Sequence, residues 1–203
     1  MTAKPTRLII ASGEPRVARQ TAEALLTDWN SQFGAFAAIG KVQHVVPLVH
    51  GLAAFAHECG QSYLDLLDAG RGLTGAGLVR SAYESALTSL WLVRMKDAAL
   101  AFVNEELRQR RSLATTLRNS GLGVDEDVIT AIGRDGFVPF DSLSNARRFD
   151  LICKDLNPGG DQAYWYYRVL SGLTHPSLTL VDRYLIKAPT HEEDPVGLSL
   201  QPR

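Results

Sequence analysis

The stretch Leu78–Met95, LVRSAYESALTSLWLVRM, decides the fold class of this chain. Within it, Leu87, Leu90, Trp91 and Arg94 recur at spacings of three and four residues, which is the period of an amphipathic α-helix. The pattern predicts a long helix whose apolar face packs in the core of a helical protein.

The same period extends over most of the chain on both sides of this stretch. It predicts further helices over about 15–33, 36–68 with a bend near Pro47, 97–119, 128–132, 142–156, 161–174 and 178–186. Only residues 7–11 are typical of a strand, and one strand alone cannot form a sheet. We therefore expect an all-α helical bundle of about six to eight helices with no sheet.

This bundle is expected to form a single domain over residues 15–187. Residues 1–14 are expected to be a flexible N-terminal segment, and the acidic, proline-containing stretch 188–203 is expected to be a disordered C-terminal tail. Thr74, Asp97 and Asp161 stand at predicted helix starts, where their side chains can cap backbone N–H groups. We expect the core to be lined by Trp29, Leu87, Trp91 and Trp165.

Composition places the chain among ordinary soluble proteins. It has 203 residues, of which 45% are hydrophobic, and its 21 basic and 22 acidic residues give a formal net charge of -1. This balance produces no overall field that would attract nucleic acid or a membrane. Two cysteines, Cys59 and Cys153, are too few for a disulfide framework, and Met1–Arg7 lacks the apolar core of a signal peptide. We expect a cytoplasmic protein with no membrane partner.

Two motifs that could indicate a cofactor or a metal lack their structural context. Gly70-Arg-Gly72-Leu-Thr-Gly75 matches the dinucleotide-binding pattern, but helical spacing precedes it where that pattern needs a strand. We interpret it as a turn between two helices. His50 and His57 are two helical turns apart, too far for joint ligation without other helices. No cofactor and no metal are expected.

Arg80 and Glu84 form the first candidate site. They stand one turn apart on the predicted helix, and their stripe continues through Leu87 and Trp91 toward the core. A buried ion pair costs desolvation unless further polar groups satisfy it, so such a pair marks either structural registry or a functional site. We expect both side chains to be largely buried and hydrogen-bonded to the helix over 161–174, and both interpretations stay open.

The second candidate site lies on that later helix. Arg168, Ser171 and His175 recur over two turns and offer a permanent cation, a hydroxyl and an imidazole on one face, with Tyr167 beside them. An arginine can neutralise charge that develops at an RNA phosphorus, and an imidazole can move the proton of a 2′-hydroxyl. The alternative is structural, because His175 could cap helix carbonyls before Pro176.

Together these residues resemble a bacterial family of all-helical proteins marked by Arg-Ser-x-x-Glu and Tyr-x-x-x-Ser-x-x-x-His. The matching residues are Arg80, Ser81 and Glu84, then Tyr167, Ser171 and His175, and the resemblance covers roughly residues 36–186. That family is similar in turn to the HEPN superfamily of helical bundles, found in toxin–antitoxin and phage-defence systems. Many HEPN proteins are metal-independent ribonucleases that dimerise around an Arg-x(4–6)-His motif, whose spacing Arg168 and His175 match.

The resemblance implies a metal-independent endoribonuclease that acts as a toxin or phage-defence effector. His175 would then be a general acid or base, Arg168 a phosphate clamp, and Glu84 would orient an arginine, with Arg80, Tyr167 and Ser171 completing the site. It also implies a homodimer, RNA as substrate and an antitoxin-like protein partner. One departure is Val169, where HEPN ribonucleases usually carry a polar residue. The alternative function is a non-catalytic interaction or ligand-binding module.

Overall fold

The computed structural model describes residues 15–32, 44–133, 144–187, 196–198 and 202. Within these ranges the chain is an all-α helical bundle, as predicted. Its helices are α1 (Pro15–Gln32), α2 (Val46–Asp68), α3 (Ala76–Arg94), α4 (Ala98–Asn119), α5 (Glu126–Gly133), α6 (Phe149–Asp155), α7 (Gly160–Thr174) and α8 (Leu178–Val181), with 3-10 turns at Ser144–Arg147 and Asp182–Tyr184. The possible strand at 7–11, the N-terminal segment 1–14 and most of the tail 188–203 lie outside the described residues.

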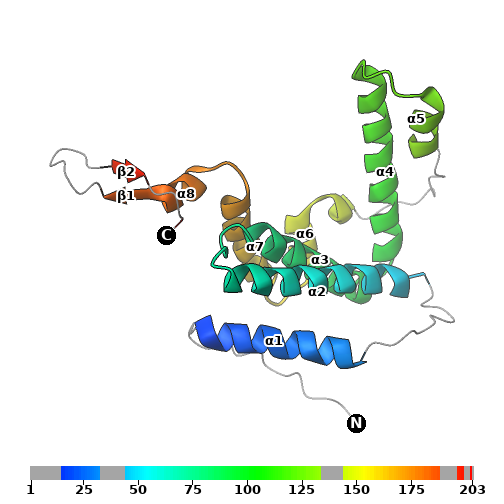
Figure 1. The fold of residues 1–203 in the computed structure, drawn as a ribbon. Coiled ribbons are helices and arrows are strands. Elements are labelled where there is room, and N and C mark those ends of the chain that lie inside the picture. The colour runs from blue at the N-terminus through cyan, green and yellow to red at the C-terminus, as the bar shows by residue number, and fades with distance from the viewer. Residues whose placement is uncertain (1–14, 33–43, 134–143, 188–195, 199–201, 203) are drawn as a thin grey trace, which may run out of the picture.

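The helices are arranged around a central hairpin of α2 and α3 (Figure 1). The short glycine-containing turn between them sends α3 back along α2, while α6 and α7 pack against α3. Helix α1 lies along α2, and α4 rises away from the hairpin with α5 beside its far end (Figure 1). The first half of α3 is therefore sandwiched between α2 and α7, which is where Arg80 lies.

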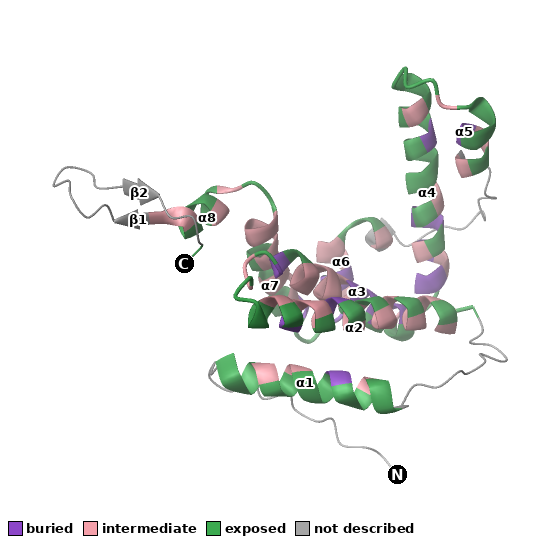
Figure 2. Cartoon of the chain, viewed as in Figure 1, coloured by how far each residue is buried: buried purple, intermediate pink, exposed green. Residues whose placement is uncertain are grey.

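The core lies where the end of α3 meets α4 and α6. Trp91 is fully buried there, and Leu92, Ala98, Ala101 and Ile152 are buried around it (Figure 2). The Trp91 indole Nε1 donates a hydrogen bond of 3.0 Å to an Asp155 carboxylate oxygen, so its one polar atom is satisfied. Small alanines at the start of α4 allow this helix to approach the indole closely.

The predicted core is confirmed at Trp91 and wrong at Trp165. Leu87 is half-buried against the cluster around Trp91, and Trp29 is half-buried against α2. Trp165, however, is 60% exposed. Helix α7 turns its Tyr167 face toward α3 and α6, and a helical residue two positions away points to a different side.

Three helix starts differ from the prediction. Pro47 lies in the first turn of α2 and begins this helix rather than bending it, because proline lacks the N–H that a first turn leaves unused. Helices α3 and α7 follow Gly75 and Gly159 rather than Thr74 and Asp161. Asp97 does precede α4, but its side chain makes no capping hydrogen bond.

The glycine-rich stretch between α2 and α3 is a turn, as predicted. A Cβ on Gly75 would lie 2.7 Å from Cδ2 of Tyr63, which is closer than real Cβ contacts. Gly70 has a φ of 70°, in the left-handed region. The glycines thus allow a tight helix–helix connection, and packing rather than a phosphate explains them.

The prediction of no sheet is wrong near the C-terminus. Leu185–Lys187 pairs antiparallel with Val196–Leu198, with Leu185 opposite Leu198, and this two-stranded ribbon replaces the end of the helix expected over 178–186. Helical periodicity is judged within one continuous segment, whereas residues 185–187 pair with residues 196–198 further along the chain. The local pattern therefore cannot reveal this pairing. The second strand of this ribbon, Val196–Leu198, falls within the stretch 188–203 that was expected to be the tail.

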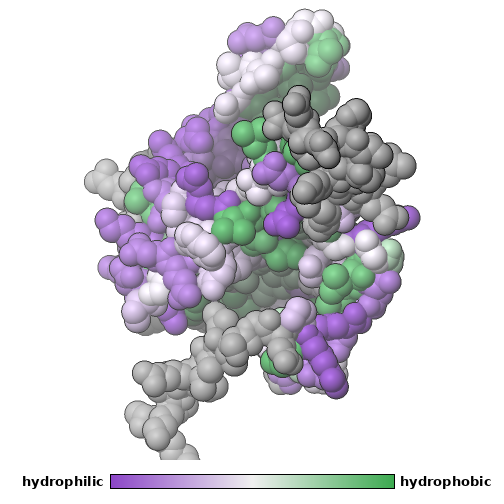
Figure 3. Space-filling model, turned by 90° about the vertical axis from the view of Figure 1, so that its left-hand side faces the viewer, coloured by the Kyte–Doolittle hydropathy of each residue, from purple (hydrophilic) through white to green (hydrophobic). Residues whose placement is uncertain are grey.

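The surface of the described residues leaves apolar area uncovered. In Figure 3, hydrophobic surface gathers in the middle of one face and is bordered by hydrophilic residues.

No described helix combines the length and the apolar character that crossing a membrane requires.

Candidate functional site

The candidate site is built around the guanidinium of Arg80, which projects from α3 toward the end of α7. Its Nη2 donates a hydrogen bond of 2.9 Å to the Tyr167 hydroxyl, and its carbon Cζ lies 5.1 Å from the centre of the Tyr167 ring. Its Nη1 lies 2.8 Å from Nε2 of His175 and 3.4 Å from the Thr174 hydroxyl. We call Arg80, Glu84, Tyr167, Thr174 and His175 the Arg80 cluster.

The contact between Arg80 and His175 constrains the role of the imidazole. A guanidinium can only donate hydrogen bonds, so a hydrogen bond across this contact requires Nε2 of His175 to be the acceptor. The tautomer that fits this geometry carries its ring proton on Nδ1. Because His175 is exposed, the accepting nitrogen lies near solvent directly beside a cation.

The position of His175 follows from the proline after it. A residue before proline is restricted to extended conformations. His175 accordingly has φ -106° and ψ 153°, which ends α7 at Thr174. Its backbone N–H still donates to the Ser171 carbonyl at 3.1 Å. The imidazole therefore leaves the face of α7 and reaches Arg80 on α3.

Glu84 is less buried than predicted. Its carboxylate oxygen Oε2 lies 3.5 Å from Nε of Arg80, but the Glu84 side chain is 35% exposed and Arg80 Nε, itself buried, makes no hydrogen bond. The expectation of a largely buried, hydrogen-bonded ion pair is thus wrong for this glutamate. Arg80 does join α3 to α7, as expected, yet through hydroxyl groups and an imidazole.

Ser171 and Arg168 lie outside these contacts. The Ser171 hydroxyl is buried and forms no hydrogen bond within the described residues. Arg168 is exposed on α7, and in the described part of the chain no hydrogen bond joins it to His175. The structure thus brings together Arg80, Glu84, Tyr167 and His175 of the sequence candidates and leaves the other two apart.

Two contributors were not among the sequence candidates. Thr174 contacts Arg80 through its hydroxyl, and Phe149 of α6 places its ring 4.5 Å from the Tyr167 ring. Phe149 therefore packs against the Tyr167 ring from α6. The His-Pro dipeptide in the sequence could have indicated that His175 leaves its helix, whereas nothing in the sequence marks Phe149.

The cysteines and the acidic residues do not add a second reactive centre in the described part of the chain. Cys59 and Cys153 are buried free thiols, and burial, with a smaller contribution from Asp150, raises the pKa of Cys153 to about 11. Such a thiol is protonated at neutral pH and is a weak nucleophile. No group of three or more potential metal ligands occurs among the described residues.

The geometry can therefore bind an anion and transfer a proton at one exposed point. Comparisons with protein-family models, with curated proteins and with solved structures find no match for this chain.

Proposed function

We propose that the Arg80 cluster cleaves single-stranded RNA without a metal ion, in an HEPN-like protein that acts in the cytoplasm as a toxin or phage-defence effector. The observation that carries this proposal is the 2.8 Å contact between Nη1 of Arg80, which can only donate, and Nε2 of exposed His175. A cation for the phosphate and a base for the 2′-hydroxyl then stand side by side.

The chemistry begins when an RNA phosphate binds to Arg80. The phosphate oxygen takes the Nη1 hydrogen bond from His175, because a charged acceptor binds a guanidinium more strongly than a neutral one. His175 Nε2 is then free to accept the proton of the 2′-hydroxyl. The 2′-oxygen attacks phosphorus, the bond to the 5′-oxygen breaks, and the imidazolium returns the proton to that oxygen. The products are a 2′,3′-cyclic phosphate and a 5′-hydroxyl.

Charge supports the same proposal. The only acid within ion-pair distance of Arg80, among the described residues, is Glu84 at 3.5 Å, and it makes no hydrogen bond to the guanidinium. The remaining partners are neutral, so the positive charge of Arg80 is only partly balanced. An RNA phosphate would complete the balance and would develop more charge during the reaction.

The same proposal includes two binding partners, a second copy of the chain and an antitoxin-like protein. Trp165 and Val169 lie four residues apart on α7 and are 60% and 44% exposed, so they offer an apolar stripe for a second copy of the chain. An antitoxin-like protein would cover His175. A sedimentation experiment at micromolar concentration should show a species of twice 22.2 kDa, and Trp165→Lys should return it to the monomer.

A second candidate function is a non-catalytic interaction module in which the Arg80 cluster only holds α3 and α7 together. Each hydrogen-bond partner of Arg80 belongs to α7 or the residue that ends it, which is the arrangement that pins two helices together. In that case the imidazole is only an acceptor, and its loss affects stability alone.

Cleavage of a labelled single-stranded RNA in the presence of EDTA separates the two functions. The wild type should cut the RNA and leave DNA of the same sequence intact, because DNA lacks the 2′-hydroxyl. His175→Ala should lower the rate by about 100-fold or more, as expected for the loss of a general base.

Arg168→Ala is the matched control, since it removes a cation from the same helix without touching the Arg80 cluster. It should keep the rate within about threefold of wild type, because an exposed charge contributes mainly to non-specific binding. If the wild type does not cut RNA and His175→Ala changes only the melting temperature, the non-catalytic module is favoured.

A further inference from the structure

A cavity lies at the end of the α2–α3 hairpin that is far from the Arg80 cluster. Arg80 and Arg94 are fourteen positions apart on α3, which separates the two places by about 21 Å along the helix. The cavity has a volume of about 1010 Å³ and lies between the end of α1, the start of α2 and the turn from α3 to α4. Its walls are largely apolar and include Val45, Val46, Val49, Leu92, Val93 and Met95.

Trp29 forms the wall that α1 contributes. Its ring stacks on His50 with centroids 6.0 Å apart and lies 4.7 Å from the ring of His57. The indole is thus fixed against α2 while also lining the cavity. A molecule that enters would contact an aromatic surface whose fluorescence reports it.

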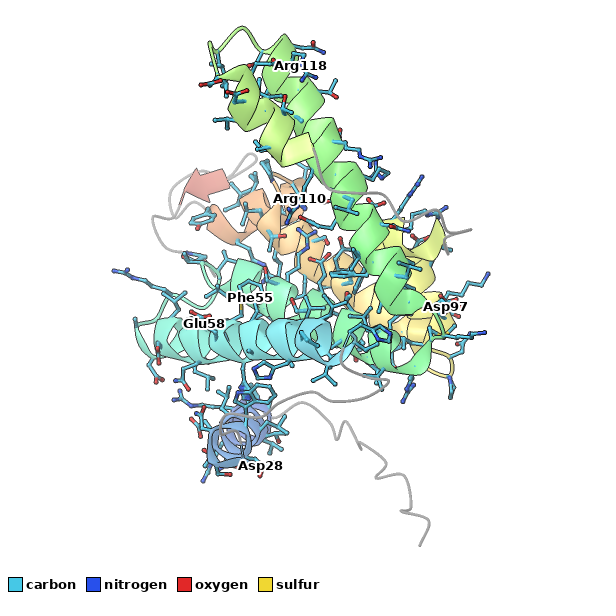
Figure 4. The ribbon with its side chains drawn as sticks, turned by 90° about the vertical axis from the view of Figure 1, so that its right-hand side faces the viewer. Asp28, Phe55, Glu58, Asp97, Arg110 and Arg118 are labelled. Carbon is cyan, nitrogen blue, oxygen red and sulfur yellow. The ribbon has the colours of Figure 1, made fainter. Side chains whose placement is uncertain are left out.

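Charged side chains gather at the same cavity. Arg94, Lys96 and Asp97 all line it and are exposed, so two permanent cations face one carboxylate. None of these three side chains forms an ion pair within the described ranges. Figure 4 looks onto this end of the hairpin, with Asp97 at the start of α4 and Asp28 on the side of α1 away from α2. The charge excess is therefore positive.

The backbone that carries these charges is held in an uncommon conformation. Asp97 has a φ of 62°, in the left-handed region, and is the only non-glycine residue with positive φ in the described chain. Such positions carry strain, and they cluster at ligand sites. Its side chain does not cap α4, so helix capping does not explain the conformation.

We propose that this cavity binds an amphipathic anion, namely a long-chain carboxylate whose alkyl chain lies on the valine, leucine and methionine walls. Its headgroup would meet Arg94 and Lys96. The volume is that of a small-molecule site, and mostly apolar walls with a few polar groups are typical of such sites. Each methylene removed from water adds to the affinity, while the two cations select the sign of the headgroup.

The probe is dodecanoate, titrated below its micelle concentration while tryptophan fluorescence is recorded. The wild type should give a saturable change that Trp29→Phe removes, although calorimetry still detects binding by that variant. Dodecyltrimethylammonium, which has the same chain and the opposite charge, should bind about tenfold more weakly or worse.

Two variants locate the ligand. Ala53→Trp fills the cavity and should abolish binding, whereas Lys96→Glu, at an exposed position, should weaken dodecanoate by about tenfold and leave the melting curve unchanged. Arg71→Glu is the matched control, because it makes the same charge change at the opposite end of α2, and it should bind like wild type.

The proposal is overturned if the ammonium probe binds as well as dodecanoate, if Lys96→Glu binds like wild type, or if the fluorescence change never saturates. Cleavage of RNA by Lys96→Glu should equal that of wild type, so failure here and failure at the Arg80 cluster are distinguishable.

Discussion

Among the described residues, a cluster of arginine and glutamate on α4 and another on α3 bury opposite charges. On α4, Glu105 is 7% exposed, and its carboxylate receives hydrogen bonds from Arg108 at 2.8 Å and Gln109 at 3.1 Å, with Arg147 at 3.2 Å. On α3, the more buried group is Arg80, whose hydrogen-bond partners are neutral and whose one acid stands at 3.5 Å.

The difference concerns how completely each buried charge is balanced. Glu105 faces two cations, and the Arg108 hydrogen bond, ahead of the contributions of Gln109 and Arg147, holds the pKa of this carboxyl below its usual range despite burial. The negative charge of Glu105 is therefore already balanced by groups of the protein, and an external ligand is not needed to balance it. Arg80 lacks such compensation, and its neighbour His175 is exposed. The first arrangement serves stability, and the second can receive an anion.

The largest effect is expected at Glu105. Glu105→Gln should lower the free energy of unfolding by about 2 kcal/mol, because it removes the charge from a buried carboxylate that accepts hydrogen bonds from charged groups, while the guanidiniums of Arg108 and Arg147 stay about half exposed to water. Glu106→Gln is the matched control, since Glu106 pairs with Arg110 on the exposed side of the same helix, and it should cost about 0.5 kcal/mol or less. Urea denaturation measures both, and equal losses would remove the contrast between the two clusters.

Acid should weaken the Glu105 cluster before it unfolds the rest. The pKa of Glu105 is lower in the folded chain than its ordinary value of 4.5, so the unfolded state binds the proton more tightly. The stability that this group contributes is present above about pH 4.5 and is lost as pH falls through the lowered pKa. Between pH 6 and pH 3, wild type should therefore lose more stability than Glu105→Gln. Parallel pH curves for the two proteins would contradict this.

A smaller effect is expected at the Arg80 cluster. Arg80→Met keeps much of the side-chain volume but leaves the Tyr167 hydroxyl without its donor, which should cost about 1–2 kcal/mol. Glu84→Gln should cost about 0.5 kcal/mol or less, because the ion pair is loose and partly exposed. A loss of about 3 kcal/mol in Glu84→Gln, measured by urea denaturation, would show a tightly buried pair instead.

The sequence predicted what depends on local periodicity. The order and approximate limits of the main helices follow from apolar spacing, and the fully buried Trp91 lies in the stretch with the clearest pattern. Trp165 shows the limit of this reasoning. It stands among four consecutive aromatic residues, and spacing alone does not say which of them faces the neighbouring helix.

The candidate site depends on contacts between distant segments, so its residues could be predicted from the sequence more readily than their partners. A seven-residue spacing predicts a shared face only while the helix continues, and α7 ends before His175. Arg80, ninety-five positions earlier in the chain, takes the place beside the imidazole that helical spacing predicted for Arg168. Such a pairing is set by the packing of α3 on α7, which no local pattern encodes.

The most direct measurement is the nitrogen-15 NMR spectrum of His175, recorded without and with an RNA oligonucleotide whose 2′-hydroxyls are methylated and which therefore cannot be cut. In the free protein, Nε2 should show the signal of an unprotonated nitrogen that accepts a hydrogen bond, with the proton on Nδ1. On RNA binding this signal should shift as Arg80 turns to the phosphate, and the shift should be absent in Arg80→Met. An Nε2 signal that stays unchanged at saturating RNA, or a free protein that carries its proton on Nε2, would contradict a phosphate site at Arg80.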